Sequence, residues 1–443
     1  MAKYQRYAEY KNSGVEWLGE MPASWDLKKH KYIAVFSKGK NPEPLLDNYS
    51  DGLYPYLSMD SLRGKANSKY AEYRKGLVLV EDNQPLIIWD GSNSGEFVLG
   101  KKGILSSTMA SASLIYKLES KFYWYVCICI EPEMRKHATG MGIPHVNGEE
   151  LRGIELPLPE IGEQKIIANF LDHETAKIDS LIEKQQQLIE LLKEKRQAVI
   201  SHAVTKGLNP DVPMKDSGVE WLGEVPEHWE TSKIKYVAEL TPKKSELSNS
   251  DSRFCTFVPM EKLKLGSLVK DEEKLISEVI GGYTYFKDGD LLLAKVTPCF
   301  ENKNMVVASG LKNGIGFGSS EIYVLRTNHK VDTQFLYYRL QEDQFMELGA
   351  GAMTGAGGLK RVPSEFLNNF EFALPPLSEQ IVITKFLNEY LIKNENLMNK
   401  AQSAIHLMQE RRTALISAAV TGKIDVRNWQ APNATEREME VST

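Results

Sequence analysis

Several short loops of the sequence carry side chains that donate hydrogen bonds to anions and nucleobases. The candidate contact residues are Lys38, Trp89, Asp90, Ser92, Asn93, Ser107, Thr108, Thr139 and His145 in the first half, and Lys295, Thr297, Asn302, Lys303, Ser320, Thr354, Lys360 and Arg361 in the second. Amide, hydroxyl and cationic donors of this kind contact phosphate oxygens and base edges, so the loops are candidates for DNA contacts. Loops rich in Gly, Ser and Asn are more often plain turns, and the residue types alone leave that alternative open.

No motif of a self-contained catalyst accompanies these loops. The glycine-rich segments 314–318 and 349–357 lack the Lys-Ser/Thr pair of a phosphate-binding loop and the context of a dinucleotide fold. The sequence has no Asn-Pro-Pro-Tyr type motif of adenine methyltransferases, no helicase signature and no convincing Ser/His/Asp set. Glu272 and Lys274 resemble the end of a nuclease motif, but they lie in a charge run that is more typical of a solvated surface. We therefore expect a chain that is not an enzyme by itself.

The composition is typical of a globular protein. The chain has 443 residues, a formal net charge of −5, 42% hydrophobic and 26% charged residues, which predicts two to four domains. The net charge argues against nucleic-acid binding, but residues 28–152 hold 17 Lys and Arg against 14 Asp and Glu. No signal-peptide core follows the start and no run of about 18 apolar residues occurs, so we expect a cytoplasmic protein outside the membrane.

The cysteines and histidines predict neither a disulfide framework nor a metal site. Cys127 and Cys129 lie in an apolar stretch, while Cys255 and Cys299 are isolated in the sequence. We expect four buried, reduced thiols. The loop histidines His137 and His145 are too sparse for a metal site and are more typical of polar loop residues.

An internal repeat organises the whole chain. Residues 13–25 return as residues 217–229 with ten of thirteen positions identical, and residues 196–205 return as residues 412–421 with seven of ten identical. The offset grows from 204 to 216 because the segment between the repeated pieces is 12 residues longer in the second copy. The intervening segments resemble each other only faintly. A tandem duplication with two unlike inserts suits a protein that recognises two different things through one geometry.

A long helical block ends each copy. Residues 163–206 and 379–421 contain neither Gly nor Pro and follow proline pairs, which predicts helices that begin just past the prolines. Their apolar residues recur in heptads, which is typical of a coiled coil. The predicted helix-interface residues are Leu171, Ile178, Leu181, Leu188, Leu192 and Val199 in the first block and Leu387, Leu397, Met408 and Leu415 in the second.

These helices are long relative to one domain. About 40 helical residues span on the order of 60 Å, so we interpret the blocks as two antiparallel helices that form a rigid spacer between globular units. The alternative is that each block is two short helices in a compact core, with a break near residues 172–175. Further apolar residues beside the predicted seam are expected to dock helices of another protein; they are Ile182, Ile189, Leu191, Met398, Ile405 and Leu407.

The two reader segments, residues 27–157 and 231–374, are predicted to be α+β domains. They have no long helical period, and they carry short apolar runs, such as residues 77–80, separated by Gly, Asn, Asp and Ser. In the repeated frame that precedes each reader, Trp17 and Trp221 occupy equivalent positions. We expect both to be packing anchors rather than base-stacking residues.

The whole pattern resembles the DNA-specificity subunit of a type I restriction-modification system. The resemblance rests on the doubled Gly-Val-Glu-Trp-Leu-Gly-Glu frame, the doubled Pro…Glu-Gln…Phe-Leu helix entry and the doubled Arg…Ala…Ile-Ser…Ala-Val-Thr helix exit. Within the readers it rests on residues 89–91, 103–108, 257–261 and 295–302. The resemblance extends from about residue 10 to residue 425, and the tail after Asp425 matches nothing.

The resemblance implies that two target-recognition domains each read one half of a split sequence in double-stranded DNA. It implies that the helices hold these domains apart and recruit two methyltransferase subunits, which carry S-adenosylmethionine and methylate adenine. Restriction subunits that use ATP and Mg²⁺ would join them, while this chain would hold no cofactor or metal. The longer second reader predicts an asymmetric target. A coiled-coil interaction scaffold without a DNA role is the alternative.

These expectations divide the chain into five parts. Residues 1–157 are the frame and first target-recognition domain, and residues 158–208 are the first helical spacer. Residues 209–374 are the repeated frame and second target-recognition domain, residues 375–424 are the second spacer, and residues 425–443 are a tail. The expected fold class is α+β, with two globular domains separated by two long antiparallel helices and an internal pseudo-twofold repeat.

Overall fold

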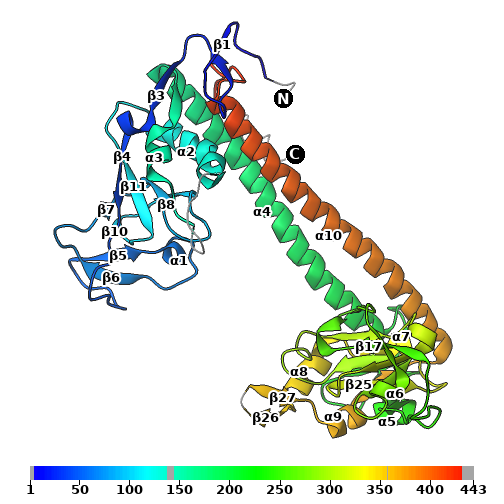
Figure 1. Ribbon diagram of the computed structural model, residues 1–443. Helices are drawn as coiled ribbons and strands as arrows, with labels where there is room; N and C mark the ends of the chain where they lie inside the picture. The colour runs from blue at the N-terminus through cyan, green and yellow to red at the C-terminus, as the bar shows by residue number, and fades with distance from the viewer. Residues whose placement is uncertain (1–3, 137–143, 357, 432–443) are drawn as a thin grey trace. The chain divides into compact units, whose positions relative to one another are not determined.

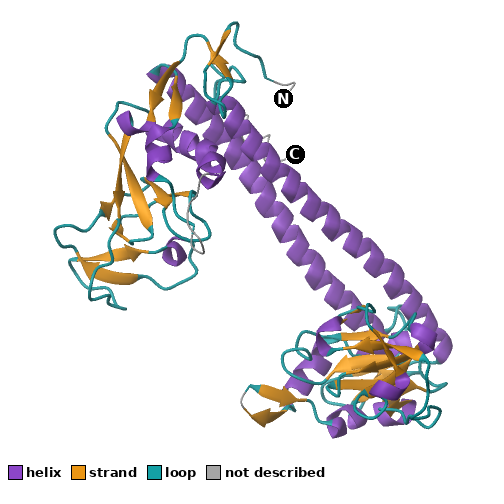
Figure 2. Cartoon of the chain, viewed as in Figure 1, coloured by secondary structure: helices purple, strands orange, loops and turns teal. Residues whose placement is uncertain are grey.

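The fold is given by a computed structural model that describes residues 4–136, 144–356 and 358–431. The chain divides into two units, of which unit 1 comprises residues 1–185 and 403–443 and unit 2 comprises residues 186–402. Each unit holds a lobe of short strands and part of two long helices (Figures 1 and 2). The predicted combination of α+β lobes with long helices is confirmed.

The lobe of unit 1 contains two four-stranded sheets. Its strands are β1 (Tyr10–Asn12), β2 (Glu20–Pro22), β3 (Asp26–Lys29), β4 (Ala34–Lys38), β5 (Leu53–Leu57), β6 (Lys69–Glu72), β7 (Leu79–Val80), β8 (Pro85–Ile88), β9 (Phe97–Leu99), β10 (Gly103–Leu105), β11 (Met109–Leu114) and β12 (Glu155–Leu158). Its short helices are α1 (Met59–Leu62), α2 (Ser120–Lys136) and α3 (Gly148–Gly153). The sheet orders are β6-β5-β10-β7 and β4-β11-β8-β9, with β1 paired to β2 and β3 to β12.

The lobe of unit 2 is built in the same way. Its strands are β13 (Met214–Asp216), β14 (Glu224–Pro226), β15 (Glu230–Lys233), β16 (Ala238–Leu240), β17 (Phe254–Val258), β18 (Leu263–Lys264), β19 (Ser267–Leu268), β20 (Glu273–Leu275), β21 (Thr284–Lys287), β22 (Leu291–Ala294), β23 (Met305–Val307), β24 (Ile315–Gly318), β25 (Ile322–Thr327), β26 (Thr354–Ala356), β27 (Leu359–Arg361) and β28 (Glu371–Leu374). Its short helices are α5 (Ile234–Val237), α6 (Ile276–Val279), α7 (Thr333–Arg339), α8 (Asp343–Gly351) and α9 (Ser364–Asn369).

The strand orders show that the duplication extends into the readers, whose sequences resemble each other only faintly. The sheets β20-β17-β24-β21 and β16-β25-β22-β23 repeat the two four-stranded orders of the first lobe. Each lobe has its one parallel pair among these strands at the same place, β5 with β10 and β17 with β24. The central strands β8 and β22 are buried along their whole length, which explains their uninterrupted apolar runs.

Helix α2 is a correction to the first reader, for which no long helical period was predicted. It has 17 residues and buries one face that includes Phe122, Val126 and Ile130. Aromatic, β-branched and cysteine residues make up much of this segment, and these residue types favour strands. The 3.6-residue spacing of the buried side chains decides for a helix because that face packs into the core of the lobe.

The long helices begin directly after their proline pairs, as predicted. α4 (Ile161–Lys206) and α10 (Leu377–Val420) are each uninterrupted, so the alternative with a break near residues 172–175 is wrong. Within that stretch, the Thr175 hydroxyl donates to the Leu171 carbonyl at 2.6 Å, a bond inside the helix. The short polar run therefore continues the helix.

A buried glutamine ties the start of each long helix to its own lobe. Gln164 Nε2 donates to the Pro159 carbonyl at 2.8 Å, and Gln164 Oε1 accepts from the amide of Glu119 at 2.9 Å. Gln380, at the equivalent position, donates to a prolyl carbonyl at 2.8 Å and accepts from a lobe amide at 2.8 Å. The glutamine of the repeated Glu-Gln pair thus has a structural role, because it satisfies buried backbone groups at the helix entry.

The two long helices run antiparallel. In unit 1, Arg412 Nε donates to Asp179 Oδ1 at 2.8 Å. In unit 2, Asn394 Nδ2 donates to the Leu192 carbonyl at 3.1 Å. The contacting residue lies further toward the C-terminus of α4 where its partner lies further toward the N-terminus of α10. This confirms the predicted antiparallel orientation. Asn394 is buried, and a single buried polar residue at such a position favours one register of a coiled coil.

Three of the ten predicted interface residues are wrong. Leu181, Leu188 and Leu397 are 49%, 42% and 52% exposed. The other seven are buried or partly buried; they are Leu171, Ile178, Leu192, Val199, Leu387, Met408 and Leu415. In the seam, the second apolar residue of each heptad follows the first by four residues, whereas a spacing of three was predicted. Apolar residues that were predicted to lie beside the seam occupy these positions. They are Ile182, Ile189, Met398 and Ile405. Leu191 and Leu407 are exposed, as predicted.

The corrected seam predicts unequal effects for two neighbouring apolar residues of α10. Ile405 is 4% exposed and Leu407 is 63% exposed. We expect Ile405→Ala to lower the free energy of unfolding by about 2 kcal/mol because it leaves a cavity, and Leu407→Ala to change it by less than about 0.5 kcal/mol. Urea unfolding followed by far-UV circular dichroism measures both. Equal losses for the two variants would contradict the corrected seam.

The cysteines are free thiols. Cys127 and Cys255 are buried as predicted, whereas Cys129 and Cys299 are only partly buried. Among the described residues, no group of three or more His, Cys, Asp and Glu side chains is arranged to hold a metal ion. His137 lies outside the described residues. No helix in the described ranges has the length and apolar character needed to cross a bilayer.

Candidate nucleic-acid interface

In the first lobe, predicted contact residues from four segments gather where β8 ends. The Asp90 carboxylate accepts from the Lys38 ammonium at 2.8 Å and from His145 Nδ1 at 2.6 Å. Backbone hydrogen bonds join two of these segments, because the amides of Trp89 and Asp90 donate to the Thr108 carbonyl at 2.8 Å and 3.2 Å. These five residues form one cluster, which we call the lobe 1 cluster.

The carboxylate at the centre of the lobe 1 cluster is ionised. Burial by itself would raise the pKa of Asp90, but the hydrogen bonds from Lys38 and His145 outweigh burial and leave that pKa below its ordinary value. Since an ionised carboxylate only accepts, His145 donates through Nδ1, and its Nε2 is the remaining ring atom for another hydrogen bond. The side chain of His145 is 49% exposed, so this atom is accessible to a ligand.

The remaining first-lobe candidates lie close by or outside the described residues. Ser92 is exposed, as is Thr108 of the lobe 1 cluster, and Asn93 and Ser107 are partly buried. The amide of Ser107 donates to Asn41 Oδ1 at 3.0 Å. Thr139 lies outside the described residues, so its placement stays a prediction.

In the second lobe, the equivalent gathering lies where β22 ends. Arg361 Nε and Nη2 donate to the two carboxylate oxygens of Glu321, at 2.8 Å each. These hydrogen bonds lower the pKa of Glu321. The Lys295 ammonium lies 5.0 Å from the centroid of the Tyr323 ring. We call these four residues the lobe 2 cluster.

The hairpin of β26 and β27 adjoins the lobe 2 cluster and carries further candidates. Thr354 pairs with Arg361 across the hairpin, and Thr297 donates to the Lys360 carbonyl through its amide at 3.0 Å and its hydroxyl at 3.2 Å. Thr354 and Lys360 are exposed. Gly355 has a φ of +144°, and a Cβ there would lie 2.4 Å from a backbone oxygen, so only glycine fits. A two-stranded β-ribbon is one of the elements that the DNA major groove admits.

Lys303 is the candidate that the structure separates from the others. Its ammonium donates to the Gln341 carbonyl at 2.8 Å and to Asp343 Oδ1 at 2.7 Å, so it is held at the start of α8. Asn302 and Ser320 are exposed. Ser320 precedes Glu321 and thus lies at the cluster, whereas the Lys303 amine already has two partners.

Three residues in or next to these clusters were missed by the sequence reasoning. Glu321 lies in a loop that was singled out for its hydroxyl groups, but its bond to Arg361 depends on sheet register. Tyr323 is a strand residue whose ring faces Lys295. Asn41 accepts from the Ser107 amide at 3.0 Å and from the Tyr56 hydroxyl at 2.8 Å. A carboxylate next to a predicted contact hydroxyl was the only signal, and it concerned Glu321 alone.

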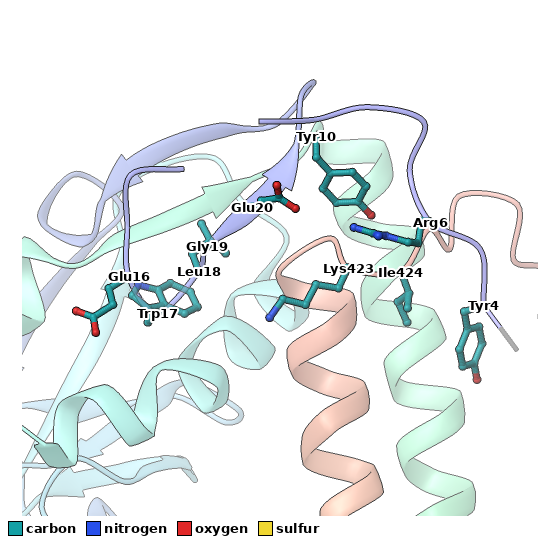
Figure 3. A pocket seen from close by; sticks show the side chains of 10 residues that line it. All are labelled: Tyr4, Arg6, Tyr10, Glu16, Trp17, Leu18, Gly19, Glu20, Lys423 and Ile424. Carbon is teal, nitrogen blue, oxygen red and sulfur yellow. The ribbon is translucent and has the colours of Figure 1, made fainter. Parts of the chain in front are cut away.

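A hollow of about 640 Å³ in unit 1 is separate from the lobe 1 cluster. It lies where the N-terminal segment meets the residues that follow α10, and Lys423 extends from there toward Trp17 (Figure 3). The Arg6 guanidinium lies 4.8 Å from the centroid of the Tyr10 ring. Among the described residues, no predicted contact residue lines the hollow. Trp17 packs against the core cluster of this unit, in agreement with its predicted role as an anchor.

A family model described as the type I restriction modification DNA specificity domain matches two segments of the chain, residues 22–191 and 226–406. The type I restriction enzyme MjaVIII specificity subunit of Methanocaldococcus jannaschii is 29% identical over 424 residues, covering 92% of this chain and 95% of that protein. The EcoEI specificity subunit of Escherichia coli is 32% identical over 197 residues, covering 44% of this chain and 33% of that protein.

Two solved structures share the fold. One chain comes from a study of complex assembly and conformational transition of the type I R-M system; it has a TM-score of 0.64 at 15% identity and covers 90% of this chain and 98% of its own. The HsdS subunit from Thermoanaerobacter tengcongensis has a TM-score of 0.52 at 15% identity and covers 91% of this chain and 98% of its own. At this identity the likeness concerns the fold, and the two matched family segments coincide with the two copies of the duplication.

Proposed function

Because the chain belongs to the type I restriction modification DNA specificity family, we propose that it recognises the DNA sequence for a type I restriction-modification complex, with each lobe reading one half of a split target. The observation that carries this proposal is the pair of clusters at the ends of β8 and β22. The same fold places different side chains at the same strand end in the two lobes. Unlike residues on one scaffold support an asymmetric target.

The partners follow from the same proposal. Two methyltransferase subunits bind this chain and carry S-adenosylmethionine, and restriction subunits that use ATP and Mg²⁺ join the complex in the cytoplasm. The chain itself contributes recognition and assembly. Exposed apolar side chains along α4 and α10 support a role of the helices in binding these subunits; they include Leu181, Leu188, Leu191, Ile392, Leu397 and Leu407.

Deletion of the gene tests the proposed function directly. Methylome sequencing of the deletion strain is expected to lose one bipartite, adenine-methylated motif that the parent strain carries. Re-expression of the chain is expected to restore that motif. An unchanged methylome in a strain that expresses the whole system would contradict the proposal and favour a protein-interaction scaffold.

Exchange of one reader tests the division of labour between the lobes. Residues 231–374 replaced by the corresponding segment of another family member are expected to alter one half of the methylated motif and to leave the other half unchanged. The separate sheets and hydrogen-bonded cluster of each lobe support this expectation. Changes in both halves would contradict independent reading.

Lys360→Ala is expected to weaken DNA binding by a similar factor for all sequences. Lys360 is exposed on the hairpin, and an amine that neutralises one phosphate contributes a salt-dependent, sequence-independent term. The slope of log affinity against log salt concentration is expected to fall by about 1 for the complex with its methyltransferase subunits. Lys330→Ala is the matched control, since Lys330 is exposed beyond the other end of β25. Equal slopes for the wild type and Lys360→Ala would place Lys360 away from phosphate.

A further inference from the structure

The ends of β8 and β22 are the same position in the duplicated fold. Both strands occupy the third place in sheets of the same order. After β8, the amide of Trp89 donates to the Thr108 carbonyl at 2.8 Å, and after β22 the amide of Lys295 donates to the Glu321 carbonyl at 3.0 Å. Trp89 therefore corresponds to Lys295, and Thr108 corresponds to Glu321.

The segment that returns to each strand end fixes a second correspondence. An isolated antiparallel bridge pairs Asp90 with His145 in the first lobe and Val296 with Arg361 in the second. In both lobes the amide of the following valine donates to the carbonyl of the residue just after the strand, at 2.9 Å. His145 and Arg361 therefore occupy equivalent positions in the two lobes, although sequence identity does not reveal this equivalence.

At this equivalent position, a carboxylate accepts a hydrogen bond from a nitrogen donor in both lobes. The carboxylate comes from a different segment in each lobe. In the first lobe Asp90, directly after β8, holds His145 at 2.6 Å. In the second lobe the equivalent of Asp90 is the buried Val296, and Glu321 before β25 holds Arg361 with two bonds of 2.8 Å. Both lobes thus maintain an oriented, accessible donor by different means.

The neighbouring side chains also differ between the lobes. The first lobe has Trp89 and Ala110 at the positions that Lys295 and Tyr323 occupy in the second, because Ala110 pairs with Ile87 as Tyr323 pairs with Leu293. The second lobe has the cation Lys295 beside Tyr323, whose hydroxyl donates to the Val362 carbonyl at 2.9 Å. The two lobes therefore present different side chains next to the shared position.

The donors that remain available differ in number. In Arg361, Nε and Nη2 donate to Glu321, and Nη1 has no hydrogen-bond partner among the described residues. The side chain is 42% exposed, so the Nη1 and Nη2 edge is accessible. Two parallel donors match the O6 and N7 acceptors of guanine in the major groove. His145 has only Nε2 for a further bond.

The carboxylates argue for base edges rather than phosphates as the ligand. Glu321 is itself 27% exposed beside Arg361, and Asp90 is 21% exposed beside His145. A phosphate at either donor would lie close to a carboxylate of the same sign, which costs free energy. A base edge is neutral, and a charged acceptor behind the guanidinium fixes its orientation without repelling the base.

We propose that His145 and Arg361 are the equivalent base-reading residues of the two lobes, and that Arg361, oriented by Glu321, reads a guanine through two hydrogen bonds. His145, oriented by Asp90, makes a single hydrogen bond to a base edge in the other half-site. This assignment rests on the proposed function. It adds the position in each lobe that reads a base and the residue at that position, which differs between the two lobes.

Arg361→Lys tests the second lobe, because lysine keeps the charge and removes the paired donors. The complex with its methyltransferase subunits is assayed on duplexes that carry the methylated motif and each single-base substitution in it. We expect discrimination at one guanine of one half-site to fall by about 5- to 150-fold. Discrimination at every position of the other half-site is expected to stay unchanged.

Arg253→Lys is the matched control for this variant. Arg253 Nε and Nη2 donate to Asp251 at 3.0 Å and 2.7 Å, and its side chain is 53% exposed. It is therefore an arginine of the same lobe with the same kind of carboxylate pair, outside the lobe 2 cluster. We expect Arg253→Lys to leave discrimination at all positions unchanged.

His145→Arg tests the first lobe by a gain of function. Asp90 already lies beside position 145, so the new guanidinium has the carboxylate that orients it. We expect a new preference for guanine, of about 5-fold or more, at one position of the other half-site. This result does not depend on whether Arg361→Lys alters the stability of the second lobe.

The outcomes separate this assignment from the proposed function. A wild-type complex that methylates no bipartite motif would refute the proposed function itself. A wild-type complex that reads its motif while Arg361→Lys keeps full discrimination, or loses affinity equally for all duplexes, would overturn the assignment of Arg361. An unchanged motif for His145→Arg would overturn the equivalence of the two positions.

Discussion

Trp229→Ala is expected to lower the free energy of unfolding of unit 2 by about 3–5 kcal/mol. The Trp229 side chain is fully buried, and its Nε1 donates to Glu379 Oε2 at 3.1 Å. Its ring also lies against Gly207, just past the end of α4. The residue thus joins the repeated frame to the end of one long helix and the start of the other. Urea unfolding followed by far-UV circular dichroism measures the loss.

The equivalent residue of unit 1 provides a matched comparison. Trp25 is also fully buried, but its Nε1 has no hydrogen-bond partner among the described residues. We therefore expect Trp229→Phe to cost more than Trp25→Phe, by about 1 kcal/mol, because only the first loses a hydrogen bond to a carboxylate. Tyr236→Ala, at a side chain that is 58% exposed, is the surface control. A loss for Trp229→Ala no larger than for Tyr236→Ala would contradict this role.

The frame shows how much a repeat in the sequence predicts about packing. Identical residues at equivalent positions predict one structural task, and Trp221 performs it by stacking on the Phe370 ring at a centroid distance of 4.8 Å. The sequence does not rank the tryptophans of the frame. Trp25 and Trp229 are fully buried, whereas Trp17 is partly buried, because burial depends on which lobe residues close over each ring.

The long helices show where residue patterns give the element but not its contacts. Proline positions and the lack of Gly and Pro predict the beginnings and the continuity of α4 and α10. The choice between Leu181 and Ile182 for the seam depends on which face of the helix is buried. In the sequence, a spacing of three residues and a spacing of four residues fit the apolar pattern almost equally well. Packing selects the isoleucine.

The clusters show what the sequence leaves open about a site. Loop composition predicts Asp90, His145 and Arg361 as contact residues, but it does not predict that the last two are equivalent. That equivalence depends on two isolated bridges between segments far apart in the chain. Glu321 was missed for the same reason, since a carboxylate that orients a cation is recognised only when sheet register brings the two together.

Acid is expected to destabilise unit 1 through His30, with the loss confined to about pH 6.5 to 4. His30 is fully buried, its Nδ1 donates to the Leu151 carbonyl at 3.1 Å, and its Nε2 accepts from the Tyr123 hydroxyl at 2.7 Å. Burial lowers the pKa of His30 from 6.5 to about 4. Between these values the unfolded chain binds the proton and the folded chain does not, so stability falls as the pH falls.

The difference between wild type and His30→Asn isolates this contribution. Asparagine keeps a donor for the Leu151 carbonyl and does not titrate, so the stability advantage of the wild type is expected to shrink by about 3 kcal/mol from pH 6.5 to pH 4. Urea unfolding of both proteins across this range measures it. A constant difference would mean that the pKa of His30 is not lowered in the folded protein.

Glu131 in the same unit provides a control of opposite sign. Burial raises the pKa of Glu131 to about 7, although its carboxylate accepts from the amide of Phe97 at 2.8 Å. Between pH 7 and about 4.5 the folded chain holds the proton and the unfolded chain does not, so this group adds stability as the pH falls. The advantage of the wild type over Glu131→Gln is therefore expected to grow in the range where its advantage over His30→Asn shrinks. Opposite slopes from two variants of one lobe would exclude a general acid effect, because such an effect acts on wild type and variant alike and would leave both differences constant.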